Sequence, residues 1–446
     1  MYKKITKPND HTKQLIKLAL PIVMSLLLQM AYNMIDLFWV GHISSDAVAA
    51  VGSAVFFVHL GVALCSIVSI GTMIKISQSV GAKDVEMQHK YAAASMILGL
   101  GIGIIYITVL FLFSSELISF LNIDSAWVNE KAVLYLRIIA IGALISYFNI
   151  IFTAILNAHG KTKLSFKAVL WGNIINLILD PIFIFVFDWG IAGAAWATVL
   201  AWVVSFIYFY GIIYKQKLVV FNFKGIKANT YKALLKVGGA GAAQRILFTL
   251  IAIVLGKIVA SFGPDAIAAQ KIGIQVESLT FLMVGGLQQS LSIMVGQAHG
   301  AKRTLDINHL YKSALKIGAI VAACTTLLFM AVPEQLMSIF IDNPETIEIG
   351  KYYIIIVGVS QLFMTLEMIT GGAFNGQGLT HYSATISVIF TAMRIPLAIY
   401  LCSTPLGIYG VWWSISITSI AKGIVSAIIY RIKYQRTLLS AGTLTT

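Results

Sequence analysis

Two aspartates lie inside long apolar runs of this sequence, where a carboxylate is costly unless it is paired, hydrated or protonated. The first, Asp36, follows Gln29 and Tyr32 at spacings of three and four residues, so the three side chains share one face of a helix. Asn33 lies on the same turn. This face is the first candidate for binding an ion or a polar group of a substrate.

The second aspartate, Asp180, follows Asn176 by four residues, so this pair also shares a helix face. Pro181 removes the amide that would bond to the carbonyl of residue 177, which predicts a kink beside the carboxylate. Thr198 lies eight residues into the next apolar run. Two neighbouring carboxylates share a proton or bind a cation, and carboxylate, amide and hydroxyl oxygens are ligands for a hard cation.

We therefore predict a binding site for H⁺ or Na⁺ formed by Asp36, Asn176, Asp180 and Thr198. The alternative is that both aspartates lie near helix ends and extend their carboxylates to the water at the membrane surface.

Other polar residues in apolar runs are weaker candidates for lining a substrate cleft. Together with the Asp36 face they are Gln29, Tyr32, Asn33, Asn149, Asn157, Gln244, Glu277, Gln288, Glu367 and Arg394. The alternative for the charged members is internal ion pairing, for example of Glu367 with Arg394.

The composition predicts which elements position these residues. Of the 446 residues 58% are hydrophobic and only 11% are charged, whereas soluble domains carry roughly 25% charged residues. Apolar runs long enough for the ~20 residues that cross a bilayer recur throughout the chain. The sequence thus predicts an all-α polytopic membrane protein with twelve spans, at about 15–41, 47–75, 91–113, 130–157, 163–187, 190–214, 232–261, 266–297, 309–333, 347–375, 380–402 and 406–430.

The net charge of +14 is explained by topology rather than by a nucleic-acid partner. With the N-terminus inside, 22 of the 32 Lys and Arg residues fall on the cytoplasmic side, among them Lys3, Lys4, Lys7, Lys224 and Arg436. This bias follows the positive-inside rule and predicts that both termini face the cytoplasm. Asp36, Asp180 and Thr198 then all lie roughly 8–12 Å below the outer boundary, at 1.5 Å per residue.

An internal repeat organises the chain. Asp46–Ala50 recurs at Asp265–Ala269 with an offset of 219, Leu156–Gly160 at Phe374–Gly378 with an offset of 218, and Gly190–Trp196 at Gly407–Trp413 with an offset of 217. Each half holds six spans, so the halves have the same orientation and should be related by a pseudo-two-fold along the membrane normal. We predict a six-helix bundle at 1–214, a cytoplasmic linker at 215–231 and a second bundle at 232–446.

Polar chemistry differs between the halves, because Leu255 is the counterpart of Asp36 and Glu367 that of Asn149. Enzymatic and motor functions are disfavoured, since no Walker A, HExxH, GxSxG or dinucleotide-binding motif is present. Cys65, Cys324 and Cys402 form no CxxC pair. We expect no cofactor and a transport process driven by an ion gradient.

These features together resemble the MATE (multidrug and toxic compound extrusion) family over essentially the full length. The resemblance rests on the parallel repeat, Leu20–Pro21, Asp36–Gly41, Val80–Ala82, Asn157–Thr162, Asn176–Pro181 and Gly190–Thr198. It implies a multi-pass protein of the cell (cytoplasmic or inner) membrane that exports organic, often cationic, compounds in antiport with H⁺ or Na⁺. In the DinF-like branch the coupling residues correspond to Asp36, Asn176, Asp180 and Thr198, whereas Gln244 lies near the position of a NorM-like acidic residue.

The resemblance also leaves an alternative, since flippases of lipid-linked or polysaccharide precursors share this fold. They generally have a more cationic cavity, and here the cations within the spans are Arg137, Arg245 and Arg394, with Lys422 nearer the cytoplasm. A non-transporting membrane scaffold would leave the two aspartates unexplained. We expect small organic molecules and the lipid bilayer as partners, no nucleic acid, and function as a monomer.

Overall fold

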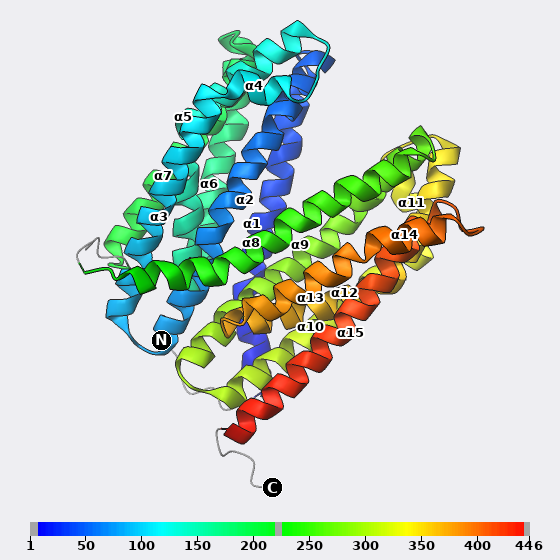
Figure 1. The fold of residues 1–446 in the computed structure, drawn as a ribbon. Coiled ribbons are helices and arrows are strands. Elements are labelled where there is room, and N and C mark those ends of the chain that lie inside the picture. Colours follow the sequence, from blue (N-terminus) through cyan, green and yellow to red (C-terminus); the bar gives the residue numbers. More distant parts are fainter. Residues whose placement is uncertain (1–7, 219–224, 441–446) are drawn as a thin grey trace. The chain divides into compact units, whose positions relative to one another are not determined.

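The computed structural model describes residues 8–218 and 225–440, with side chains described for 10–218 and 225–435, and within these ranges every regular element is a helix (Figure 1). Lys3, Lys4 and Lys7, residues 219–224 of the predicted linker and the side chain of Arg436 lie outside the described residues.

From residue 8 to residue 218, the described part of the first half, the chain contains seven α-helices and one π-helical segment. These are α1 (Pro8–Gly41), α2 (Ser45–Gly81), α3 (Val85–Leu112), α4 (Ser114–Ser119), α5 (Ala126–Ala158), α6 (Thr162–Pro181), η1 (Ile182–Val186) and α7 (Gly190–Lys215). The segment η1 continues α6, so that α6 and η1 together make one candidate membrane span.

The second half has the same order of elements. It contains α8 (Ala228–Ala260), α9 (Pro264–Gly300), α10 (Thr304–Ala331), α11 (Pro333–Ser338), α12 (Pro344–Gly376), α13 (Thr380–Ala392), α14 (Arg394–Cys402) and α15 (Tyr409–Ser440). Within the described residues twelve helices are long and apolar enough to cross a membrane, which confirms the predicted number of spans.

The repeat seen in the sequence recurs in the backbone of the connecting turns. Gly160 and Gly378 have φ of 72° and 77°, and Gly190 and Gly407 have φ of 52° and 51°. This left-handed region is favourable for glycine because glycine has no Cβ. Each half therefore closes corresponding loops with glycine in corresponding conformations.

Contacts between Cα atoms divide the chain into two compact units, and the divisions fall within α1 and α8. We call Leu20–Ala242 the N-terminal unit, and Met1–Ala19 with Ala243–Thr446 the C-terminal unit. These limits differ from those at residues 214 and 232 because two long helices each contribute to both units. The sequence-based limits described segments of the chain rather than contacts, and they stay a prediction.

Each unit has its own apolar core. The N-terminal unit buries one cluster around α2, α5 and α7 that includes Val51, Leu136 and Ile139, and a second around Phe152 and Phe209. The C-terminal unit buries one cluster around Leu291 and Phe374 and another around Trp412.

Glycines allow the closest helix crossings within each unit. In the N-terminal unit a Cβ on Gly238 of α8 would lie 1.7 Å from the carbonyl oxygen of Ile67 on α2. In the C-terminal unit a Cβ on Gly423 of α15 would lie 2.4 Å from the carbonyl oxygen of Phe363 on α12. Small residues at such crossings let helix backbones approach closely in a membrane protein. The crossing at Gly423 also determines where the neighbouring residue, Lys422, enters the unit.

Candidate functional site

The N-terminal unit brings the four predicted ion-binding residues into one buried polar cluster. Asp36 lies on α1, Asn176 and Asp180 on α6, and Thr198 on α7. Their exposed fractions are 9%, 1%, 0% and 3%, respectively. Such burial argues against aspartates that extend to the membrane surface. Asp36 and Asp180 are also close enough to interact electrostatically.

Hydrogen bonds join the helices around this cluster. The Nδ2 of Asn176 donates to Oδ1 of Asp180 at 3.0 Å. The hydroxyls of Tyr32 on α1 and Thr198 on α7 are bonded at 3.0 Å. The amide therefore fixes one carboxylate on its own helix, and the hydroxyl pair ties α1 to α7 beside it.

Two carboxylate oxygens of this cluster have no hydrogen-bond partner among the described residues. Oδ1 of Asp36 and Oδ2 of Asp180 are buried and accept no hydrogen bond from the described residues. Buried carboxylate oxygens are normally satisfied, because leaving one unpaired is costly. Two such oxygens with a nearby amide and hydroxyl can accept a proton or a hard cation, so the residues present fit either ion.

A local break in the helix sets the position of Asp180. Pro181 ends α6, and the next turn is the wide one of η1, closed by the amide of Phe187 donating to the carbonyl of Ile182 at 2.9 Å. Such π-helical turns occur often at functional sites. Gly193 of α7 packs against this turn, since a Cβ there would lie 2.6 Å from the carbonyl of Phe183. The predicted kink is thus a change of helix type, and it brings α7 close enough to place Thr198 at the site.

Tyr135 on α5 belongs to the same cluster and was not among the predicted site residues. It is 3% exposed and interacts electrostatically with Asp36, Asp180 and Tyr32. A signal was available in the repeat: at an offset of 218 its counterpart is Tyr353, another buried tyrosine that contacts a carboxylate.

The remaining candidates of the N-terminal unit form their hydrogen bonds with residues outside this cluster. Gln29 donates to Asn33 at 3.5 Å, and both side chains are exposed. Asn149 donates to the carbonyl of Trp202 at 2.9 Å. Asn157 accepts from Ser165 at 2.6 Å. The last two bonds connect neighbouring helices, which is an ordinary structural use of asparagine within a helix bundle.

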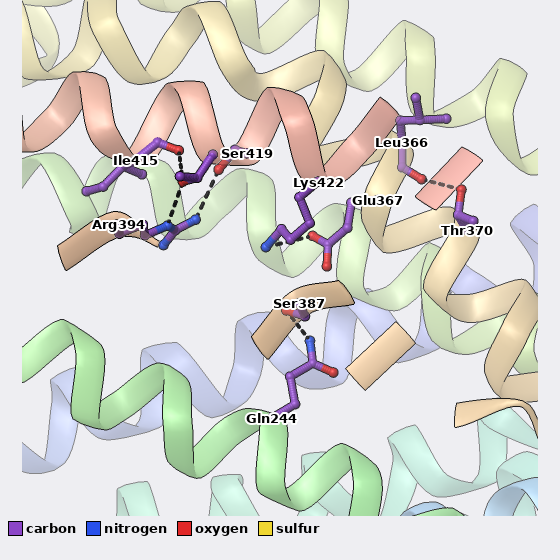
Figure 2. A network of polar contacts seen from close by, with 10 residues as sticks. Gln244, Leu366, Glu367, Thr370, Ser387, Arg394, Ile415, Ser419 and Lys422 are labelled. Carbon is purple, nitrogen blue, oxygen red and sulfur yellow. Dashed lines mark hydrogen bonds and ion pairs between the residues drawn. The ribbon is translucent and has the colours of Figure 1, made fainter. Parts of the chain in front are cut away.

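The C-terminal unit holds a second polar network, which joins α8, α12, α13, α14 and α15 (Figure 2). Glu367 on α12 forms an ion pair with Lys422 on α15 at 3.2 Å. Arg394, the first residue of α14, donates from Nε to Thr418 at 3.1 Å and from Nη2 to Ser419 at 3.0 Å. The suggested Glu367–Arg394 pair is therefore wrong, because Lys422 takes the carboxylate and two hydroxyls of α15 take the guanidinium.

The other candidates of this unit also form hydrogen bonds or close contacts. The carboxylate of Glu277 accepts from the Tyr353 hydroxyl at 3.2 Å and from Gln361 at 3.1 Å. Gln244 on α8 donates to Ser387 on α13 at 2.9 Å, and Figure 2 draws this hydrogen bond below the Glu367–Lys422 pair. The backbone of Gln288 packs against α12, since a Cβ on Gly372 would lie 2.7 Å from the backbone carbonyl oxygen of Gln288.

No group of three or more His, Cys, Asp or Glu residues suited to a metal ion occurs in the part of the chain that the structure describes. A hard cation would consequently have to use the amide and hydroxyl of the N-terminal cluster as well as its two carboxylates.

Comparison with known proteins gives the geometry its context. The family model described as MatE matches residues 21–182 and 242–400, that is, one stretch in each half. The chain is 29% identical over 413 residues to a probable multidrug resistance protein NorM of Thermotoga maritima, an alignment that covers 90% of this chain and 88% of the relative.

A second relative is the multidrug export protein MepA of Staphylococcus aureus, 24% identical over 413 residues, with 91% of this chain and 90% of the relative covered. Among solved structures, the Vibrio cholerae MATE transporter VcmN in its bent form superposes with a TM-score of 0.91 at 23% identity, covering 97% of this chain and 99% of that one. At this identity the superposition establishes the twelve-helix fold.

Proposed function

The chain belongs to the MatE family of membrane transporters, and from that premise we propose that it is a secondary multidrug exporter that expels organic, often cationic, compounds in exchange for H⁺ or Na⁺. As a member of this family it is a multi-pass transporter of the cell membrane and not an enzyme. Export is supported by the relatives from Thermotoga and Staphylococcus, which are named as multidrug resistance and export proteins.

The observation that carries the coupling proposal is the pair of buried carboxylates in the N-terminal unit. Asp36 and Asp180 interact electrostatically and each keeps one oxygen without a partner. Binding of H⁺ or Na⁺ neutralises this pair, and release of the ion restores the charge. The ion thus changes the free energy of one conformation of the site more than that of another, which is the requirement for coupling.

The exchange proceeds in two steps. From outside, the ion binds at Asp36, Asn176, Asp180 and Thr198. Its binding neutralises the carboxylates and kinks α1 about the polar face that contains Tyr32. In this kinked conformation the affinity for the organic compound is lower. The ion-loaded protein then faces inward, releases the ion and takes up substrate from the cytoplasm or the inner leaflet. Both termini face the cytoplasm in this scheme, and the monomer is the transporting species.

The experiment is efflux of a fluorescent organic cation from vesicles under an imposed Na⁺ or H⁺ gradient, for the wild type and for Asp36→Asn. The matched control is Asp124→Asn, which alters an exposed aspartate in a loop of the same unit. Gradient-driven efflux in the wild type and the control, lost in Asp36→Asn, supports the proposal and identifies the ion. Well-folded protein that drives no efflux under either gradient refutes it and favours the flippase.

A further inference from the structure

The polar network of the C-terminal unit coincides with the ion-binding cluster of the N-terminal unit at one position of the repeat. At an offset of 218 Arg394 is the counterpart of Asn176, and at 219 Leu255 is the counterpart of Asp36. Where one half places a carboxylate and an amide, the other half places an apolar side chain and a buried guanidinium. At these two positions the C-terminal unit therefore lacks a carboxylate and carries a positive charge instead of a neutral amide.

In the described part of the chain Arg394 forms side-chain hydrogen bonds to neutral groups alone. Its side chain is 7% exposed, and among the described residues no carboxylate oxygen lies within 4.0 Å of its nitrogens. Thr418 and Ser419 accept two of the five N–H groups, and the ring of Phe248 lies 5.9 Å from the guanidinium carbon. Hydroxyls satisfy donors but leave the charge in place, and a buried charge without an ionic partner is unusual.

A second buried cation lies one helical turn further along α15. Lys422 is four residues after Thr418, which accepts from Arg394, so both cationic groups meet the same face of α15. Glu367 is the one carboxylate in ion-pair contact with either of them in the described part of the chain. Glu277 and Glu367 both interact with Arg394 from beyond ion-pair distance. The carboxylate of Glu277 is engaged by Tyr353 and Gln361, and that of Glu367 by Lys422. Of the two buried cations, Lys422 has a directly paired carboxylate and Arg394 does not.

We propose that Arg394 and Lys422 bind the anionic group of an exported compound, a carboxylate in the first instance. The planar guanidinium keeps N–H groups free for a carboxylate, which it can bind through two parallel hydrogen bonds. Lys422 supplies a second charge, for which the substrate competes with Glu367. This inference rests on the proposed export function and adds a substrate class to it, namely amphiphiles that carry an acidic group.

A purely structural role for the network predicts a different behaviour. If Arg394 only fastened α14 to α15 through Thr418 and Ser419, its replacement would weaken transport of every compound alike. A binding role instead makes the loss depend on whether the transported compound carries a carboxylate.

The test compares two dyes that differ at that group alone: rhodamine 110, with a free carboxylate, and its methyl ester, rhodamine 123. Arg394→Gln is expected to lower efflux of rhodamine 110 at least about tenfold, as for loss of one partner of a buried charge pair, and to leave rhodamine 123 efflux unchanged. The matched control is Arg431→Gln, which removes an exposed arginine of α15 in the same unit. Equal losses for both dyes, or no loss for either, would overturn the proposal.

Binding is measured separately, so that failure of the export function does not hide the answer. Fluorescence anisotropy of each dye with detergent-solubilised wild type should show preferential weakening of rhodamine 110 on Arg394→Gln, even if no gradient drives efflux. Wild type that binds the acid no better than Arg394→Gln does would refute the site whatever the transport result. If Arg394→Gln does not fold, Arg394→Lys and Ser419→Ala take its place, and both should reduce selectivity for the acid.

Discussion

The two units place charge in their membrane-spanning helices in opposite ways. In the N-terminal unit Asp180 accepts a hydrogen bond from the neutral amide of Asn176, and Asp36 and Asp180 each keep an oxygen without a partner among the described residues. In the C-terminal unit Glu367 and Lys422 neutralise each other, and the guanidinium of Arg394 is held by hydroxyls. Equivalent positions of one fold thus carry different chemistry, which shows that the helices determine where a group lies and not what it binds.

The largest expected effect tests the C-terminal half of this comparison. Glu367→Gln leaves the Lys422 ammonium buried without its carboxylate, and the free energy of unfolding should fall by about 3–5 kcal/mol. Denaturation of the purified protein in detergent measures this loss. The control is Glu86→Gln, which breaks the exposed pair with Lys90 and should lower the free energy of unfolding by about 0–1 kcal/mol.

A double replacement tests whether Glu367 and Lys422 stabilise the protein by neutralising each other. Glu367→Gln combined with Lys422→Met should recover much of the stability, because no unpaired charge remains. A double variant as unstable as the single one would contradict the assignment of a mutually neutralising pair.

The next effect is on transport and tests the N-terminal half. Asp180→Asn should reduce ion-driven efflux about 100-fold, because the amide carries no charge for the ion to neutralise. Its free energy of unfolding should not fall, since a neutral side chain replaces a buried carboxylate with an unpaired oxygen. Efflux assays and denaturation of the same preparation give both quantities, and a stability loss matching that of Glu367→Gln would remove the contrast between the units.

A smaller effect concerns the crossing that brings Lys422 to Glu367. Gly423→Ala places a Cβ 2.4 Å from the Phe363 carbonyl, so α15 must move away from α12, at a cost of about 1–3 kcal/mol in the free energy of unfolding. Gly256→Ala is the control, because a Cβ there has no neighbour within 4 Å. Equal stability of the two variants would mean that the crossing does not hold the pair together.

The smallest expected effect refines the N-terminal site. Thr198→Val removes the hydroxyl bonded to Tyr32, a loss of about 1 kcal/mol that should weaken the apparent affinity for the coupling ion several-fold. Ion titration of efflux measures it, with Thr108→Val, at an exposed threonine of α3, as the control. An unchanged ion affinity would place Thr198 outside the ion-binding set.

Sequence alone predicted the helices better than their contacts. Twelve apolar runs predicted the twelve spans, and helical spacing brought Asn176 to Asp180 as observed. The partner of Glu367 was missed because it depends on how α12 and α15 cross at Gly423, a property of packing rather than of periodicity. Tyr135 was missed because helical spacing does not distinguish one buried tyrosine among many apolar residues, and its one signal lay in its repeat counterpart, Tyr353.

The wide turn of η1 determines where a single residue can be deleted from this span without changing the orientation of Asp180. Between Gly160 and Gly190 the first half has one residue more than the second half has between Gly378 and Gly407. A π-helical turn is an α-turn with one residue inserted, and it leaves the flanking helix in phase. Deleting a codon within 182–186 should therefore preserve the orientation of Asp180, whereas deleting one between 163 and 175 would rotate it by about 100° relative to the start of α6.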